Sequence, residues 1–195
     1  MLEYRLALCD NFQILSANGI YMSTGHVEYA SLNGTHIFKL IGEVRAQSCI
    51  SLDKLLARIE QQENVIGAIV DLTQTIFIDS TVLGILAKLG LKLKQVHHIQ
   101  AVMLSTNPDI TTLANSMGLG QVFVILNYCG DPKVCTNALM DDNVNHSTML
   151  CTVLDAHKTL MKLNENNQNM FEPLVKQLEK QQNTMCTEST DKQNA

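Results

Sequence analysis

The sequence predicts an α/β fold, with a mixed β-sheet of about four to five strands, crossover helices and a C-terminal helical extension. β-type and α-type segments alternate between residues 26 and 127, as expected for strands joined by crossover helices. Asn33-Gly34 separates two β-type segments, which is a strong signal for a tight hairpin. Two amphipathic segments follow a turn-rich stretch near the C-terminus and predict the extension.

The first half of the domain begins with the hairpin strands, predicted at 27–32 and 35–44. A helix is predicted from Ser51 to about residue 61, because apolar residues recur at helical spacing: Leu52, Leu55, Leu56 and Ile59. The compact apolar run 65–72, V-I-G-A-I-V-D-L, predicts a buried strand.

The second half of the domain contains two more strands, at 100–104 and 122–126, and two helices. The first helix follows Asp79, and one apolar arc of it is expected to face the sheet: Val82, Ile85, Leu86, Leu89, Leu93 and Val96. Asn107-Pro108 predicts the start of the second helix, and Gly118 predicts its end.

The extension is predicted to hold two helices. The first spans 147–163 and places His157 on an apolar face, where a packed histidine is the usual interpretation. In the second, apolar residues recur at helical spacing from Phe171 to Leu178, and Pro173 should lie in its first turn or kink it.

The chain divides into five expected segments. Residues 1–21 are interpreted as a leader that need not belong to the native protein, because M-S-T-G from Met22 resembles a natural start, although Met1 stays open as the start. The other segments are the α/β domain (22–127), a turn-rich linker (128–146), the helical extension (147–183) and a polar, disordered tail (184–195).

The composition favours a protein of the cytoplasm. Hydrophobic residues make up 46% of the 195 residues, enough for a substantial core. The net charge of −5 does not favour direct nucleic-acid binding. No stretch has the roughly eighteen apolar residues of a membrane span, and six scattered cysteines fit reduced thiols in a cytosol.

Nothing in the sequence predicts a metal site, a cofactor or a catalytic group. No cysteine or histidine pair has metal-ligand spacing backed by a second pair. The sequence also offers no nucleophile with a histidine and an acid, no phosphate-cradling glycine loop and no paired catalytic carboxylates. We therefore expect a binding protein that is not an enzyme.

The helix after Asp79 carries a second strip of small and apolar residues outside the sheet-facing arc. Leu83, Gly84, Gly90 and Leu91 fall on this strip. An exposed strip of this kind predicts a docking surface for a partner. The alternative is that Leu83 and Leu91 contact the C-terminal helices.

The start of the same helix can act as a switch. Asp79 is placed to cap the helix by accepting a backbone N–H bond, and Ser80 then lies in the first turn. A phosphate on Ser80 would add a charge of about −1.5 to −2, which a helix N-terminus tolerates but an apolar or acidic partner does not. The alternative is that the hydroxyl groups of Ser80 and Thr81 only support the helix start.

Three segments carry a resemblance to a known family. The stretch D-L-T-Q-T-I-F-I-D-S-T-V-L-G-I-L-A-K-L at 71–89 resembles the signature of STAS domains, the fold of bacterial anti-anti-sigma factors. L-I-G-E-V at 40–44 and S-M-G-L at 116–119 resemble two further family segments, in the right order. The C-terminal extension is similar to that of a proteobacterial subgroup of these antagonists, linked by resemblance to general-stress sigma control.

The resemblance implies partner switching. Ser80 is at the position that an anti-sigma factor kinase phosphorylates, and Thr81 is the alternative acceptor. The unphosphorylated protein would bind the anti-sigma factor, the phosphorylated protein would release it, and a PP2C-type phosphatase would reset the switch. The residues expected to form the partner-binding surface are Asp79, Ser80, Thr81, Leu83, Gly84, Leu91 and Arg45.

Two departures from the family pattern and one alternative function remain. Val82 replaces the glycine that usually follows the hydroxyl pair, and Arg45 replaces a common acid.

The alternative function is a STAS subunit of an ABC-type lipid transporter, although such subunits typically lack C-terminal helices. Homodimer formation, the role of the helices, and the identity of the sigma factor, kinase, phosphatase and stimulus stay open.

Overall fold

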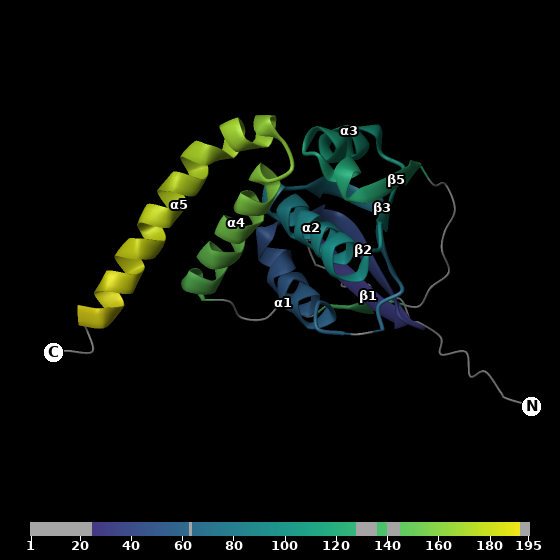
Figure 1. Cartoon of the computed structure of the whole chain (residues 1–195), viewed down its shortest axis with the longest axis horizontal. Helices are drawn as coiled ribbons and strands as arrows, with labels where there is room; N and C mark the ends of the chain where they lie inside the picture. The colour runs from purple at the N-terminus through teal and green to yellow at the C-terminus, as the bar shows by residue number, and fades with distance from the viewer. Residues whose placement is uncertain (1–24, 63, 128–135, 140–144, 192–195) are drawn as a thin grey trace, which may run out of the picture.

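The computed structural model describes residues 25–62, 64–127, 136–139 and 145–191 (Figure 1). The strands are β1 (His26–Leu32), β2 (Thr35–Val44), β3 (Gly67–Ile78), β4 (Ala101–Ser105), β5 (Phe123–Asn127) and β6 (Asn137–Ala138). The α-helices are α1 (Ile50–Ile59), α2 (Ser80–Lys92), α3 (Pro108–Ser116), α4 (His146–Met161) and α5 (Glu165–Asp191). Short helical turns are η1 (Ala46–Cys49), η2 (Leu93–His97) and η3 (Leu119–Gln121).

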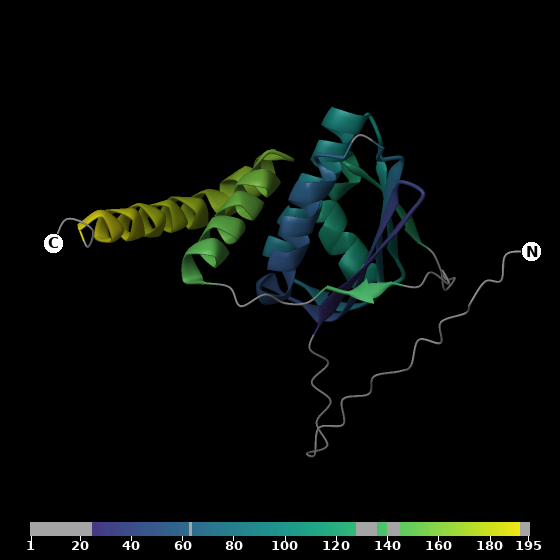
Figure 2. The ribbon, with the colours of Figure 1, turned by 90° about the horizontal axis from the view of Figure 1, so that it is seen from below.

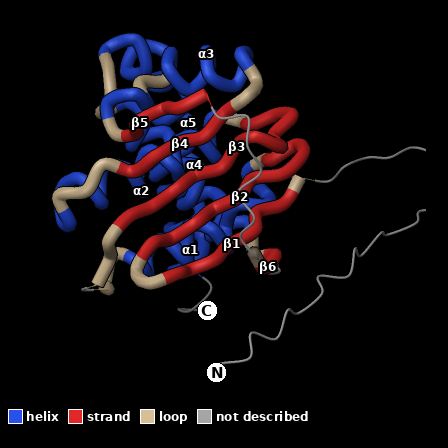
Figure 3. The backbone as a smooth tube through the Cα atoms, turned by 90° about the vertical axis from the view of Figure 1, so that its right-hand side faces the viewer, coloured by secondary structure: helices blue, strands red, loops and turns tan. Residues whose placement is uncertain are grey.

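The strands form one six-stranded sheet in the order β5-β4-β3-β2-β1-β6 (Figure 3). β1 pairs antiparallel with β2 and β6, whereas β2, β3, β4 and β5 pair in parallel. The predicted mixed sheet is confirmed, but the count of four to five strands is one short. The additional strand, β6, lies in the segment expected to be linker. Backbone groups on the free edge of β1 recruit it, and Leu139 N–H donates to the Val27 carbonyl at 2.8 Å.

The predicted hairpin turn and helix ends are confirmed. Asn33 and Gly34 both have positive φ, 50° and 81°, as a tight hairpin turn requires. The Asn107 side chain accepts from Asp109 N–H with Pro108 in the first turn of α3, and Gly118 ends that helix with φ 80°. These local signals lie within short stretches of chain, which is why they were legible in the sequence.

The core lies between the sheet and the layer formed by α1 and α2. Most of the predicted apolar arc of α2 is buried against it: Val82, Ile85, Leu86, Leu89 and Leu93. Val96, expected on the same arc, is instead 54% exposed. The reason is that η2 is a π-helical turn, whose wider winding rotates the following side chains away from the α-helical register.

Helices α4 and α5 form a third layer, on the side of α1 and α2 away from the sheet (Figure 2). α5 begins at Glu165, earlier than expected, so that Pro173 lies inside it. It continues to Asp191, beyond residue 183, where we expected order to end. No glycine or second proline interrupts this polar stretch, so a helix can propagate through it.

Parts of the predicted organisation lie outside the described residues. These are the leader at 1–21 and two stretches of the linker, 128–135 and 140–144. Among the helices that the structure does describe, none combines the length and the apolar character needed to cross a membrane.

Candidate functional site

Asp79 joins the start of α2 to the end of β2. One carboxylate oxygen, Oδ1, accepts from Val82 N–H at 2.9 Å and caps the helix as predicted. The other, Oδ2, accepts from Ala46 N–H at 2.8 Å, 33 residues away in the chain. Asp79 N–H also donates to the Val44 carbonyl at 3.3 Å. Both ends of this carboxylate are therefore engaged, and they fix where the next residue, Ser80, stands.

Ser80 is the first residue of α2, is half-buried, and contacts a histidine from α4. Its Oγ lies 3.0 Å from Nε2 of His157. The other ring nitrogen, Nδ1, lies 2.8 Å from the Val153 carbonyl, an acceptor that requires Nδ1 to carry the proton. In the neutral imidazole, Nε2 is then an acceptor, so the Ser80 hydroxyl donates to it.

His157 itself is deeply buried and held on two sides. His157 is only 3% exposed. The Phe171 ring on α5 packs edge-on against its imidazole ring, with 5.0 Å between the two ring centroids. The prediction of a packed histidine on an apolar face is confirmed. The sequence did not show that this histidine contacts the candidate switch serine, because 77 residues separate the two.

The two neighbouring hydroxyl residues differ in exposure. Thr81 is buried, whereas Ser80 is half-buried at the helix start. Of the two candidate phosphate acceptors, Ser80 is therefore the more accessible one in this structure.

The strip on α2 that was expected to be exposed is largely buried, and α4 covers it at Gly84, whereas Gly90 faces Val122 and Phe123. Leu83 is fully buried, and a Cβ added to Gly84 would lie 2.4 Å from the Ala156 carbonyl oxygen. Leu91 is partly buried and packs against the core. The expectation of an exposed strip is thus wrong for this arrangement of the chain, and the contact with the C-terminal helices that the structure shows is between Gly84 and Ala156. The physical reason is that Gly84 and Ala156 lack bulk, which lets the two helix backbones approach closely.

Lys88 ties three helices together beside this contact. Its ammonium group lies 2.7 Å from Asp155 on α4 and 3.1 Å from Asp53 on α1. Partial burial acts to lower the pKa of Lys88, but the hydrogen bond to Asp155 and the charge of Asp53 outweigh it and raise the pKa above its usual value. Lys88 therefore stays charged at neutral pH and links α1, α2 and α4 through polar contacts.

Arg45 lies at the open side of the site, in a cluster that the sequence showed only in part. Its guanidinium group stacks over the Phe77 ring, 4.5 Å from the centroid, and pairs with Glu43 at 3.0 Å. Phe77 is 40% exposed and its neighbour Ile76 is 64% exposed. These two apolar residues were missed as surface residues, because I-F-I before Asp79 reads as the end of a buried strand. Since Ala46 follows Arg45 and bonds to Asp79, the cluster borders the start of α2.

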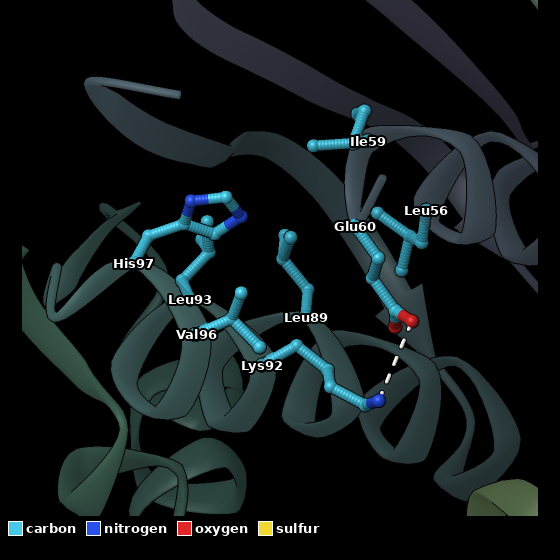
Figure 4. A pocket seen from close by; sticks show the side chains of 8 residues that line it. All are labelled: Leu56, Ile59, Glu60, Leu89, Lys92, Leu93, Val96 and His97. Carbon is cyan, nitrogen blue, oxygen red and sulfur yellow. Dashed lines mark ion pairs between the residues drawn. The ribbon is translucent and has the colours of Figure 1, made fainter. Parts of the chain in front are cut away.

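A hollow near α2 lies at the opposite end of the helix from Ser80. A narrow, mainly apolar pocket opens between α1 and the last turn of α2, where Lys92 pairs with Glu60 at 3.4 Å (Figure 4). Ser80 stands about 18 Å away along the helix axis, given a rise of about 1.5 Å per residue. Within the described ranges, no group of three or more histidine, cysteine, aspartate or glutamate side chains could hold a metal ion.

The comparisons with known proteins identify the family. The STAS domain family model matches residues 26–131. Two solved structures align with 52% of this chain at 18% sequence identity. One is the anti-sigma factor antagonist SpoIIAA in its unphosphorylated form, with a TM-score of 0.46 and 88% of that chain covered. The other is the Bacillus cell fate determinant SpoIIAA in the phosphorylated form, with a TM-score of 0.44 and 91% of that chain covered.

The chain has no match among curated proteins. The family model covers more than half of the chain, and it includes the predicted signature at 71–89 and the whole of α2. The predicted family is therefore confirmed, and the chain belongs to the STAS domain family.

Proposed function

We propose that this protein is an anti-sigma factor antagonist that acts by partner switching. With Ser80 unphosphorylated, it binds an anti-sigma factor and so frees a sigma factor. The anti-sigma factor is also the serine kinase that phosphorylates Ser80, and phosphorylation releases the complex. A PP2C-type phosphatase then restores the hydroxyl group. In this role the protein is a cytoplasmic binding protein without catalytic residues of its own.

The observation that carries the proposal is the placement of Ser80. It is the first residue of α2, follows a capping aspartate in the D-S-T segment of a STAS domain, and is more exposed than Thr81. A helix start accepts added negative charge, so a phosphate there would alter the surface without requiring the fold of the STAS domain itself to change.

The chemistry of the switch is a reversible phosphoryl transfer. The Ser80 hydroxyl oxygen forms a bond to the terminal phosphorus of a nucleoside triphosphate held by the kinase, and the bond to the diphosphate leaving group breaks. The hydroxyl proton passes to a base on the kinase. In the reverse direction, the phosphatase hydrolyses the ester with water and releases inorganic phosphate. The phosphate adds a charge of about −1.5 to −2 next to Asp79, and a partner surface that accepted a neutral hydroxyl is repelled.

The partner-binding surface that we propose centres on this helix start. Asp79, Ser80 and Thr81 form its middle, and Arg45 forms its edge together with Phe77. An aromatic ring with an arginine stacked on it is typical of residues that dominate binding energy at protein interfaces. Leu83, Gly84 and Leu91 are buried or partly buried here, so they would belong to the surface only after α4 has moved off Gly84.

The test uses the full-length protein and a purified anti-sigma factor kinase from the same genome. Wild type and Ser80→Ala should bind it, and Ser80→Asp should bind at least about tenfold more weakly, a loss of about 1.4 kcal/mol. Incubation with the nucleotide should place phosphate on Ser80, as located by mass spectrometry, and Thr81→Val should still be phosphorylated. Equal binding by wild type, Ser80→Ala and Ser80→Asp would contradict a switch at Ser80. That result would instead favour a constitutive scaffold such as a transporter subunit.

A further inference from the structure

Helix α4 lies on the same face of α2 that begins with Ser80. We infer that the α4–α5 pair is a detachable intramolecular cover, which competes with kinase and partner for this face of α2. The inference rests on the proposed function and goes beyond it, because it assigns a regulatory role to the helices that follow the STAS domain. The family match ends at residue 131, before α4 begins.

Three contacts define how the cover sits on α2. Ser80 bonds to His157, Gly84 faces Ala156, and Lys88 pairs with Asp155. The first and last α2 partners are eight positions apart, about 12 Å of helix, whereas the α4 partners are three consecutive residues. The two helices therefore cross, and the glycine and alanine stand where the backbones come closest.

The closed arrangement restricts access to Ser80. The imidazole of His157, carried by α4, stands 3.0 Å from the oxygen that must bond to phosphorus, in space that an incoming phosphoryl group or partner needs. The Phe171 ring packs edge-on against this imidazole and supports its position. A kinase needs the serine clear of α4, and a partner must replace α4 on Gly84. Either event requires α4 to leave first.

The contact has the composition of a reversible interface. At the crossing its contacts include a small residue, Ala156, one serine–histidine hydrogen bond and one partly exposed ion pair to Lys88. Exposed or half-exposed ion pairs contribute about 1 kcal/mol or less. Leu160, Leu163 and Phe171 belong to the buried core, and this apolar contact favours the closed arrangement when no partner is bound.

The two helices can leave as one unit. Lys158 pairs with Glu179 at 2.7 Å, and the His157 ring meets the Phe171 ring, so α4 and α5 hold each other. Their connecting turn is fastened to the domain by Gln121, whose side-chain N–H donates to the Leu163 carbonyl at 2.7 Å. Asn167 adds a bond to the Met117 carbonyl at 2.9 Å.

The cover also indicates what kind of partner fits this face. The displacing surface should be a helix with a small residue at its closest approach to Gly84. It should offer a hydrogen-bond acceptor to Ser80 and a carboxylate to Lys88. A phosphate on Ser80 would remove the donor that such a helix requires.

The first experiment measures detachment without any partner. Diethylpyrocarbonate acylates accessible, unprotonated imidazoles, and mass spectrometry locates each modified histidine in the full-length protein. Exposed His98 serves as the reference for free reaction, and His36, which is 1% exposed, reports whether the domain stays folded. Two variants should loosen the cover: Ala156→Arg on α4 and Gly84→Ala on α2.

Gly84→Ala is a mild change because alanine favours an α-helix over glycine, yet its Cβ meets the α4 backbone. Gly67→Ala is the matched control, since its Cβ would have only ordinary contact with Thr35 at 3.9 Å. We expect the acylation rate of His157 to rise at least about tenfold in both loosening variants. This factor assumes that α4 is detached in about a tenth or less of the wild-type molecules and in most molecules of the variants. His36 should stay unmodified in both variants, and Gly67→Ala should behave as wild type.

Two results would overturn the inference at this stage. In the first, His157 stays slow in both loosening variants. In the second, His157 reacts only together with His36, which would mean that the extension and the domain unfold as one unit.

The second experiment measures competition, with the same kinase as above. Ala156→Arg alters only the cover, so it should bind the anti-sigma factor about tenfold more tightly than wild type if the open form is about a tenth of the population. Unchanged or weaker binding by this variant, with His157 freely acylated, would show that the cover does not compete. If neither wild type nor Ala156→Arg binds or is phosphorylated, the proposed function fails, whereas the acylation result still decides whether the extension detaches.

Discussion

Removal of the Asp79 carboxylate should destabilise the fold at the candidate site more than loss of an ordinary helix cap would. Asp79→Ala deletes two acceptors at once, one for Val82 N–H and one for Ala46 N–H. Asp79→Asn keeps an oxygen for the Val82 bond, but its amide nitrogen would face the Ala46 N–H, so that two donors meet. The pair of variants therefore separates the local cap from the long-range bond.

The structure allows the size of the effect to be estimated. Loss of a helix N-cap costs about 1 kcal/mol. Loss of a hydrogen bond to a charged acceptor costs about 1.5–3 kcal/mol. Because Asp79 is only half-buried, we take the lower part of the combined range and expect a loss of about 2–3 kcal/mol for Asp79→Ala. For Asp79→Asn, which loses only the second bond, we expect about 1–2 kcal/mol.

Urea denaturation of the full-length protein measures these losses. The chain has no tryptophan, so unfolding is followed by far-UV circular dichroism. With a slope of about 1–3 kcal/mol per molar urea, Asp79→Ala should lower the midpoint by roughly 1 M. Asp109→Ala is the matched control, because Asp109 lies in the first turn of α3 and is exposed. If Asp79→Ala costs no more than this control, the role assigned to Asp79 in joining β2 to α2 is refuted.

Three further predictions concern other parts of the domain. Burial lowers the pKa of His36 and the charge of His97 lowers it further, so stability should fall as the pH drops below the unfolded value of about 6.5. Urea midpoints against pH measure this, and His36→Gln should flatten the slope; an unchanged slope would contradict it. Gly34→Ala should lower the free energy of unfolding by about 1–3 kcal/mol, because φ is +81° and the added Cβ would lie 2.5 Å from the Asn64 carbonyl oxygen. Thermal melting measures this loss, and an unaltered melting temperature would count against the strain. Lys88→Met should cost about 0.5–1 kcal/mol at low salt and less at high salt, and a salt-independent loss would indicate packing instead of charge.

The features that sequence reasoning located correctly depend on near neighbours in the chain. The positive φ at Asn33 and Gly34 follows from residue types in the turn itself. The cap at Asp79 and the apolar arc of α2 follow from helical spacing within one element. The family resemblance likewise rests on a continuous stretch around Ser80, and the family match confirms it.

The errors arose where another element of the fold changed the outcome. The sixth strand formed in an apparent linker, because the free edge of β1 offered unpaired backbone groups. Val96 left the apolar arc, because a π-helical turn altered the register. The exposed strip on α2 turned out to be an interface, because a helix that begins more than sixty residues later packs on Gly84.

The sequence by itself determined the fold class, the family and the position of the candidate switch serine. All three are encoded in local spacing and in one continuous motif, so no knowledge of distant contacts was needed. The tertiary structure alone decided what that serine contacts. Helical spacing placed His157 on an apolar face of its own helix, but only the packing of α4 across α2 could bring it to Ser80. Which distant helix packs on a given surface depends on the shape and bulk of both partners, and the small residues Gly84 and Ala156 supply that fit only once both helices have formed.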